Sequence, residues 1–411
     1  MKISQQFAPP FKLIAPFFIS AIIVFILCSL FLFNIDLNSI NSQNLDILAF
    51  VHLFLLGFAM MTIFGAMAQL VPVILEVEHF AVELYYAVYP LLFIGTILMV
   101  IGFYSYPILL SYGGLITFIS FLIFICETFL TLFKVKKIKF ISLIVLFANL
   151  FLFFGVVVGF LMALAYGGFI NIDLDSWLKV HIYFVLFGYV GFTIMGLSYV
   201  LIPMFWLSHG FDDRYLKYAL IILATCVIAL FFAELFSLKT ISSYIDFFIF
   251  ISFLLYFYQL IIIYKKRVRK QRDIYFIYLA FFIIGIFLSL LSACLYLYFR
   301  SDKLFLIIGF LAMYSIISPL ILGHFYKIVP FLIWFQKFSP LVGKQKVPML
   351  SDMVPNKSAS FALFFNIIAS CLIFFALIFN LEILLKAGAS FMVISSIFLL
   401  KDILYMINFK G

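Results

Sequence analysis

The chain consists of long apolar stretches separated by short polar interruptions. A helix that spans a membrane needs about 20 mostly apolar residues, and twelve segments of the sequence meet this requirement. They are residues 12–34, 45–75, 80–103, 107–133, 140–168, 175–206, 215–237, 241–264, 273–299, 303–335, 358–381 and 383–408. The weakest boundary lies within 80–133, where only residues 104–107 interrupt the apolar run. The pattern predicts an all-α, polytopic membrane protein with about twelve transmembrane helices in a single domain, residues 1–411.

Composition narrows the class further. Of the 411 residues, 67% are hydrophobic and 10% are charged, whereas a soluble domain has about 45–50% apolar and about 25% charged residues. This excludes a soluble enzyme, a secreted disulfide scaffold, a disordered protein and a nucleic-acid-binding domain. A membrane β-barrel would alternate apolar and polar positions, which this chain does not do. The five cysteines lie inside apolar stretches without metal-site spacing, so we interpret them as core or lipid-facing residues.

The distribution of charge predicts an orientation in the membrane. Basic residues gather in the loops after segments 4, 8 and 10: Lys134, Lys136, Lys137 and Lys139; Lys265, Lys266, Arg267, Arg269, Lys270 and Arg272; Lys337, Lys344, Lys346 and Lys357. The loops after segments 1 and 5 carry aspartates instead. Because positively charged loops stay in the cytoplasm, both the N-terminus and the C-terminus are expected there. A composition rich in Phe, Ile, Leu and Lys indicates an AT-rich bacterial genome, and hence a multi-pass protein of the bacterial inner (cytoplasmic) membrane.

An internal repeat links three of the segments. Segment 2 contains Asp46, His52, Gly57, Gly65 and Pro72, and segment 6 contains Asp175, His181, Gly188, Gly196 and Pro203. In both, the Asp-to-His spacing is six, the Gly-to-Gly spacing eight and the Gly-to-Pro spacing seven. Segment 10 keeps the last spacing with Gly323 and Pro330. Repeats four segments apart predict three related four-helix units, approximately residues 1–135, 136–268 and 269–411.

Three histidines are the candidate cofactor ligands, because an ionisable group inside a bilayer is costly and marks a functional position. His52 and His181 occupy matching positions of the repeat, and imidazole suits both haem iron and copper. A histidine hydrogen-bonded between helices is the alternative. His324 is a weaker candidate beside Lys327. It lies one residue after its repeat glycine, whereas the other two precede theirs by 13 and 15, so it is 14–16 residues deeper, roughly 20 Å along a helix.

The other polar groups of the apolar segments are few. Small residues near His52 and His181, among them Gly57, Gly65, Gly188, Gly191 and Gly196, either make room for a flat macrocycle or allow close helix packing. His79 and His209 follow segments 2 and 6 and are expected to be solvated or interfacial. Glu127 and Glu234 lie near segment ends and are also expected at the interface. The sequence shows no dense series of buried acids or bases of the kind that a pump needs.

Together these features resemble the catalytic subunit of haem–copper oxidases and, more closely, its divergent relatives of the NnrS family. The resemblance rests on twelve segments, on His52 and His181 near the outer ends of segments 2 and 6 with their Gly and Pro spacing, and on residues 326–334. It implies that His52 is an axial haem ligand and His181 a copper ligand. It also implies haem b and/or copper as cofactors, respiratory-chain subunits or a cytochrome as electron donor, and a role in respiration or nitric oxide handling.

The chain departs from that family at the oxygen-reducing site. Segment 215–237 has no histidine, and segment 10 has only the deep His324. A complete binuclear oxygen-reducing centre therefore cannot be assembled. The leading hypothesis is a haem- or copper-binding membrane protein that is not a complete oxygen reductase. A transporter that uses the repeat for alternating access, with breaks at Pro72, Pro203, Pro319 and Pro330, is the alternative, and a structural partner of a respiratory complex is the third.

Overall fold

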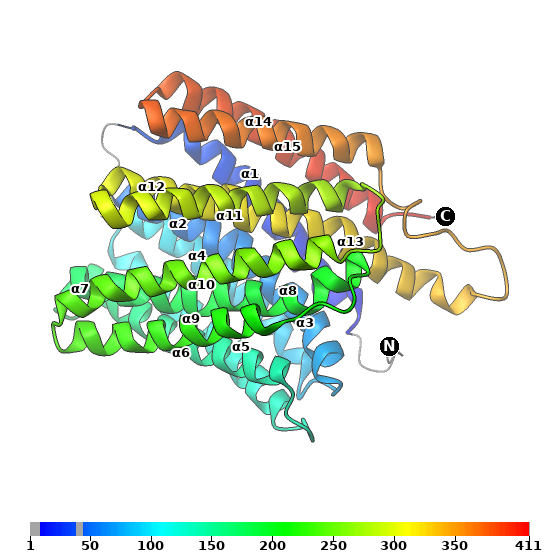
Figure 1. Ribbon diagram of the computed structural model, residues 1–411, viewed down its shortest axis with the longest axis horizontal. Helices are drawn as coiled ribbons and strands as arrows, with labels where there is room; N and C mark the ends of the chain where they lie inside the picture. The colour runs from blue at the N-terminus through cyan, green and yellow to red at the C-terminus, as the bar shows by residue number, and fades with distance from the viewer. Residues whose placement is uncertain (1–8, 38–43, 411) are drawn as a thin grey trace. The chain divides into compact units, whose positions relative to one another are not determined.

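The computed structural model describes residues 9–37 and 44–410, and this part of the chain is built almost entirely from helices (Figure 1). The α-helices are α1 (Phe11–Phe31), α2 (Leu45–His52), α3 (Met61–Leu75), α4 (Tyr85–Tyr104), α5 (Ile108–Leu132), α6 (Phe140–Tyr166), α7 (Leu174–Ile182), α8 (Phe192–Trp206), α9 (Arg214–Leu235), α10 (Lys239–Lys265), α11 (Ile274–Phe299), α12 (Asp302–Leu311), α13 (Ser318–Lys337), α14 (Asn356–Phe379) and α15 (Glu382–Ile407). Short 3₁₀ turns are η2 (Leu32–Asn34), η4 (Val82–Leu84) and η7 (Ser339–Leu341).

The predicted number of membrane spans is confirmed. Twelve helical spans among the described residues are long and apolar enough to cross a membrane. The weakest predicted boundary also holds, because α4 ends at Tyr104 and α5 begins at Ile108. Pro107 stands directly before that helix, where its missing N–H costs nothing. The chain is therefore a multi-pass membrane protein.

Three of the spans contain a π-helical segment between two α-helices. The segments are η3 (Leu53–Met60) in span 2, η5 (Tyr183–Gly191) in span 6 and η6 (Ala312–Ile317) in span 10. They end five residues before Gly65, five before Gly196 and six before Gly323, the glycines of the sequence repeat. Since π-helix is rare and is frequently found at functional sites, its recurrence at one place in spans 2, 6 and 10 distinguishes these spans from the others.

The prolines do not break these spans. Pro72, Pro203 and Pro330 lie inside the continuous helices α3, α8 and α13, and Pro319 is in the first turn of α13. Helices in membranes tolerate proline. The transporter hypothesis placed breaks in the helices at these prolines. Regular α-helix is interrupted instead in the π-helical segments, which lie on the N-terminal side of the prolines.

The helices form two compact units. Among the described residues, unit 1 comprises residues 67–271, and unit 2 comprises residues 9–37, 44–66 and 272–410, so α3 contributes to both. In unit 1, α5 packs against both α4 and α6, α6 packs along span 6, and α9 pairs with α10. In unit 2, α14 and α15 lie side by side, α1 packs on η3 and α15, and α11 packs on span 10 (Figure 1).

Large apolar side chains cover the outer faces of the helices. Phe232, Tyr244, Ile284 and Phe364 are examples, each at least half exposed in the isolated chain. In water such a surface would be unfavourable, because a soluble protein rarely exposes large contiguous apolar patches. The lipid bilayer is therefore the medium that these faces contact.

Candidate functional site

His52 and His181 occupy the same position in their spans. Each is the eighth residue of its helix, counted from Leu45 and from Leu174. Both helices start in the same way, since the side chains of Asn44 and Asp173 accept hydrogen bonds from backbone N–H groups of the first turn. A π-helical segment begins one residue after His52 and two after His181. The sequence correspondence is thus also a structural one.

Span 10 shows what replaces the histidine in the third copy. The helix begins at Asp302, so its eighth residue is Gly309. A Cβ built on Gly309 would meet no atom within 4 Å, so no neighbouring side chain occupies this position. His324 lies 15 residues further along the span and is not the counterpart of His52 and His181.

The hydrogen bonds of the three histidines define their tautomers. The Nδ1 atom of His52 lies 2.7 Å from the Leu48 carbonyl, and that of His181 lies 3.0 Å from the Gly155 carbonyl. His324 repeats the His52 arrangement, with Nδ1 2.7 Å from the carbonyl of the residue four positions earlier. A carbonyl only accepts, so each Nδ1 carries the hydrogen and Nε2 carries the lone pair of the neutral ring. This is the tautomer in which histidine binds metals through Nε2.

A pair of glycines on α6 seats the His181 ring. A Cβ on Gly159 would lie 2.6 Å from Cε1 and 3.0 Å from Nδ1 of the ring, but 3.5 Å from Nε2. The carbonyl of Gly155, one turn earlier, accepts the Nδ1 hydrogen bond. The Nδ1–Cε1 edge therefore rests on the α6 backbone, and Nε2 is the ring nitrogen farther from it. Only a residue without a side chain fits at position 159.

Side chains of neighbouring helices pack against the glycines of the repeat. A Cβ on Gly57 would lie 2.6 Å from Val24, and one on Gly65 would lie 2.7 Å from Phe17, both on α1. In span 6, a Cβ on Gly188 would lie 2.9 Å from Phe151, and one on Gly196 would overlap Ile144, both on α6. Of the two interpretations, close helix packing accounts for these four glycines, and they leave no clearance for a macrocycle.

Donor groups for a metal ion do not converge. Among residues 9–37 and 44–410, no three His, Cys, Asp or Glu side chains are placed to hold one ion. His52 belongs to unit 2 and His181 to unit 1. The two predicted ligand histidines are thus described separately, each within its own unit.

His324 and Lys327 lie together on α13, facing α11. The Tyr275 ring meets the His324 ring edge-on, with ring centres 5.1 Å apart. The Lys327 ammonium donates to the Asp273 carboxylate at 2.6 Å, just before the start of α11. The lysine therefore extends to the end of the span, where its charge is paired.

Near the start of span 6, a polar cluster lies two residues from His181. The Lys179 ammonium is 2.5 Å from the Ser242 hydroxyl and 3.6 Å from the Asp246 carboxylate. Ser242 donates to Glu234 at 2.9 Å, and the Tyr183 hydroxyl donates to Asp246. Glu234 thus belongs to a bonded network between α7, α9 and α10, which balances the charge of the lysine.

Spans 4, 8 and 12 each bury an acidic or amide side chain at nearly the same depth. Glu127 and Asp402 lie five residues before the ends of α5 and α15, and Gln259 lies six before the end of α10. Their exposed fractions are 0%, 0% and 1%. Gln259 donates to the Asp212 carbonyl at 2.8 Å, and Asp402 accepts from the Tyr326 hydroxyl at 2.7 Å. Asp402 was not among the polar groups singled out from the sequence.

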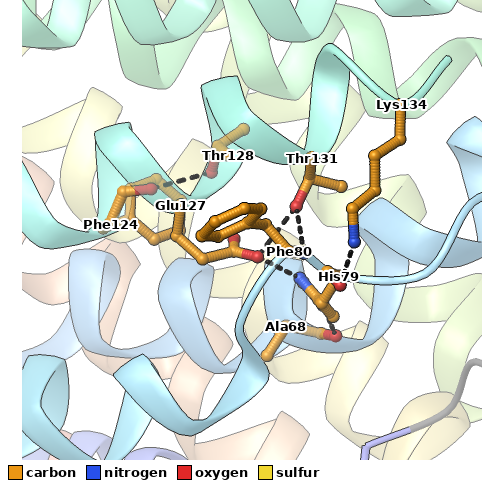
Figure 2. A network of polar contacts seen from close by, with 8 residues as sticks. All are labelled: Ala68, His79, Phe80, Phe124, Glu127, Thr128, Thr131 and Lys134. Atoms are coloured by element: carbon orange, nitrogen blue, oxygen red, sulfur yellow. Dashed lines mark hydrogen bonds and ion pairs between the residues drawn. The ribbon is translucent and has the colours of Figure 1, made fainter.

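Glu127 and His79 form a buried pair (Figure 2). The His79 Nδ1 atom lies 2.8 Å from Glu127 Oε1, and the two side chains are 4% and 1% exposed. The other ring nitrogen lies 2.7 Å from the Ala68 carbonyl, and the Thr131 hydroxyl donates to Oε1 at 2.8 Å. The expectation that His79 is solvated is therefore wrong, because the loop after α3 folds back onto α5. The interfacial position expected for Glu127 stays a prediction. His209 is exposed, as expected.

No protein-family model matches the chain, and no curated protein matches it. The functional argument therefore rests on the residues of this chain.

Proposed function

We propose that the protein is a haem-binding membrane protein in which His52 and His181 are the axial ligand candidates. The observation that carries the proposal is their shared arrangement. Both are eighth residues of capped helices that lead into a π-helical segment, and both hold Nδ1 on a carbonyl. That hydrogen bond fixes the ring and makes Nε2 the coordinating nitrogen, the usual outer-shell support of a ligand histidine.

The number of donors favours haem over a copper ion held by protein side chains. A haem brings four nitrogen ligands of its own and needs only one or two histidines. Copper sites in proteins use several convergent donors, and no group of three is found among the described residues. The glycines at positions 57, 65, 188 and 196 pack against side chains of neighbouring helices and leave no space for a macrocycle. A haem would therefore lie beside other residues. When bound, the haem would supply one-electron chemistry, with a respiratory-chain subunit or a cytochrome as the donor.

Purification followed by optical and metal analysis tests this function. The purified protein is expected to show a reduced-minus-oxidised b-type haem spectrum, which is lost or reduced in His52→Ala or His181→Ala. His209→Ala is the matched control, because this histidine is exposed in a loop. Imidazole added to His181→Gly is expected to restore the spectrum. Absence of haem from the wild-type protein, or unchanged haem content in both variants, would overturn the proposal.

Transport is the second candidate, and the π-helical segments favour it. They give spans 2, 6 and 10 a deformation at corresponding depth, and transporters use interrupted helices around their substrate sites. This function predicts no stoichiometric haem. It also predicts that a cysteine at half-buried Leu186, in a cysteine-free background, reacts with an impermeant thiol reagent from both sides of the membrane. Reaction from one side alone would contradict it.

We further propose that the chain consists of three four-helix repeats, with both termini in the cytoplasm of a bacterial inner membrane. The recurrence of π-helix in spans 2, 6 and 10 supports the repeat, as do the buried polar residues near the ends of spans 4, 8 and 12. Reporter fusions after Lys137, Arg269 and Lys346 are expected to be active only for a cytoplasmic reporter. Activity of a periplasmic reporter at any of these positions would refute the orientation.

A further inference from the structure

The His79–Glu127 pair holds a proton. Because the Ala68 carbonyl can only accept, His79 Nε2 carries a hydrogen. The 2.8 Å contact between Nδ1 and Glu127 Oε1 then needs one more proton between these two atoms. Without it, a lone pair on Nδ1 would face a carboxylate. With this proton bound, the pair is neutral as a whole, whether the proton rests on the His79 nitrogen or on the Glu127 oxygen. Without it, the pair carries one buried negative charge.

Span 8 shows that a charge is not needed to hold the neighbouring loop. At the corresponding depth, Gln259 donates to the Asp212 carbonyl in the loop before α9 and accepts from the Leu216 N–H, in the first turn of α9, at 3.3 Å. An amide has no ionised form, so it avoids the cost of burying a carboxylate. The pairing of an acid in span 4 with an imidazole in the loop that it holds therefore calls for a role beyond fastening the loop.

The second oxygen of Glu127 faces the interior of unit 1. Glu127 Oε2 is buried and has no hydrogen-bond partner among the described residues, and the same holds for the Tyr189 hydroxyl on η5. Both groups lie close enough to the Tyr85 hydroxyl to interact with it electrostatically, and the Tyr85 ring meets His79 edge-on with 5.6 Å between ring centres. Buried polar atoms without partners commonly mark bound water.

Among residues 9–37 and 44–410, His79 is the only basic side chain paired with Glu127. Lys134, at the end of α5, donates to the His79 carbonyl at 2.8 Å rather than to the carboxylate. Glu76 and Lys139 pair with each other at 2.9 Å on the surface, and Glu78 and Glu83 are exposed. The groups that face Glu127 are thus His79, Thr131 and Tyr85.

We propose that His79 and Glu127 form a proton-binding site, and that Tyr85 and Tyr189 extend it through bound water toward the π-helical segment of span 6. The ligand is a proton taken from the side of the membrane on which the loop after α3 lies. Binding forms one N–H or O–H bond between the pair, and release leaves a neutral imidazole beside a carboxylate. No electron transfer is involved, so the site is independent of the haem proposal.

Solid-state ¹⁵N NMR of histidine-labelled protein in liposomes tests the site, with the His79 signals assigned by their loss in His79→Gln. As the pH is raised over the range in which the protein stays folded, Nδ1 of His79 is expected to change from protonated to unprotonated, while Nε2 stays protonated. In Glu127→Gln, the amide can donate to Nδ1, so Nδ1 is expected to stay unprotonated throughout. Gln259→Glu serves as the matched control and should leave the His79 titration in place.

Two results would overturn the proposal. One is a constant protonation state of His79 Nδ1 across the whole pH range in the wild type, which would show that the pair only holds the loop in place. The other is an unchanged titration in Glu127→Gln, which would show that the carboxylate is not part of the site. Neither result depends on whether the protein contains haem.

Discussion

The seat of the His181 ring on α6 gives a quantitative prediction for Gly159→Ala. The added Cβ would lie 2.6 Å from His181 Cε1. Ordinary contact begins at 3.4 Å, so the ring must move by about 0.8 Å, the difference between these distances. Overpacking of this kind costs about 1–3 kcal/mol. Displacing the ring also weakens its bond to the Gly155 carbonyl, which is worth about 0.5–1.5 kcal/mol.

Helix propensity acts in the opposite direction. Alanine is about 1 kcal/mol more favourable than glycine inside a helix. The net expectation for Gly159→Ala is a loss of about 0.5–3.5 kcal/mol in the free energy of unfolding. In a His181→Ala background the ring is gone, so the same substitution is expected to stabilise the protein by up to about 1 kcal/mol. The effect of the alanine therefore changes sign between the two backgrounds.

A double-mutant cycle measures this coupling. The four variants are unfolded by a denaturing detergent in mixed micelles, and their free energies of unfolding are compared. Gly309→Ala is the control, because its Cβ meets nothing within 4 Å, and it should be equally stabilising with and without His181. If Gly159→Ala has the same effect in both backgrounds, the ring does not rest on α6 and the described geometry of the ligand candidate is wrong.

Two further predictions concern the spans and a loop. Tyr326→Phe removes the hydroxyl that donates to the buried Asp402 carboxylate and is expected to lower the free energy of unfolding by about 1–3 kcal/mol. Tyr278→Phe is the control and should cost far less, because the Tyr278 hydroxyl has no hydrogen-bond partner among the described residues. Equal losses in the two variants would contradict the hydrogen bond between Tyr326 and Asp402. At Asp213, partial burial alone would raise the carboxyl pKa, but hydrogen bonds from Lys217 and Tyr199 outweigh it and lower the pKa below its ordinary value of 3.8. The stabilisation is then complete at neutral pH and is lost as the pH falls through the lowered value, so unfolding temperatures of wild type and Asp213→Asn should converge in acid, and a constant gap would refute this.

The sequence was sufficient for the spans and for the correspondence of His52 with His181. Span length follows from bilayer thickness, and apolar runs can be read residue by residue. Both histidines then proved to be the eighth residues of their helices. The orientation in the membrane and the cofactor stay predictions.

The burial of His79 and Glu127 could not be read from local sequence. His79 stands in a polar loop beside Glu78, which is exposed, and its partner lies 48 residues away. Long-range packing decides such burial, and local polarity says little about it. One signal was present, since Glu127, Gln259 and Asp402 recur near the ends of every fourth span. The π-helical segments had no such signal, because their apolar sequences look like any other part of a span.

The π-helical segments determine how the side chains on their N-terminal side are rotated about the axis of the span. One residue turns an α-helix by about 100°, and a wider turn accommodates an additional residue within the bonded ladder. Deleting one residue from Leu53–Met60 would allow regular α bonding through the span and swing Leu45–His52 about a quarter-turn around the axis, while Gly65 stayed against α1. The direction in which His52 points is thus encoded by how many residues follow it, as much as by the residue itself.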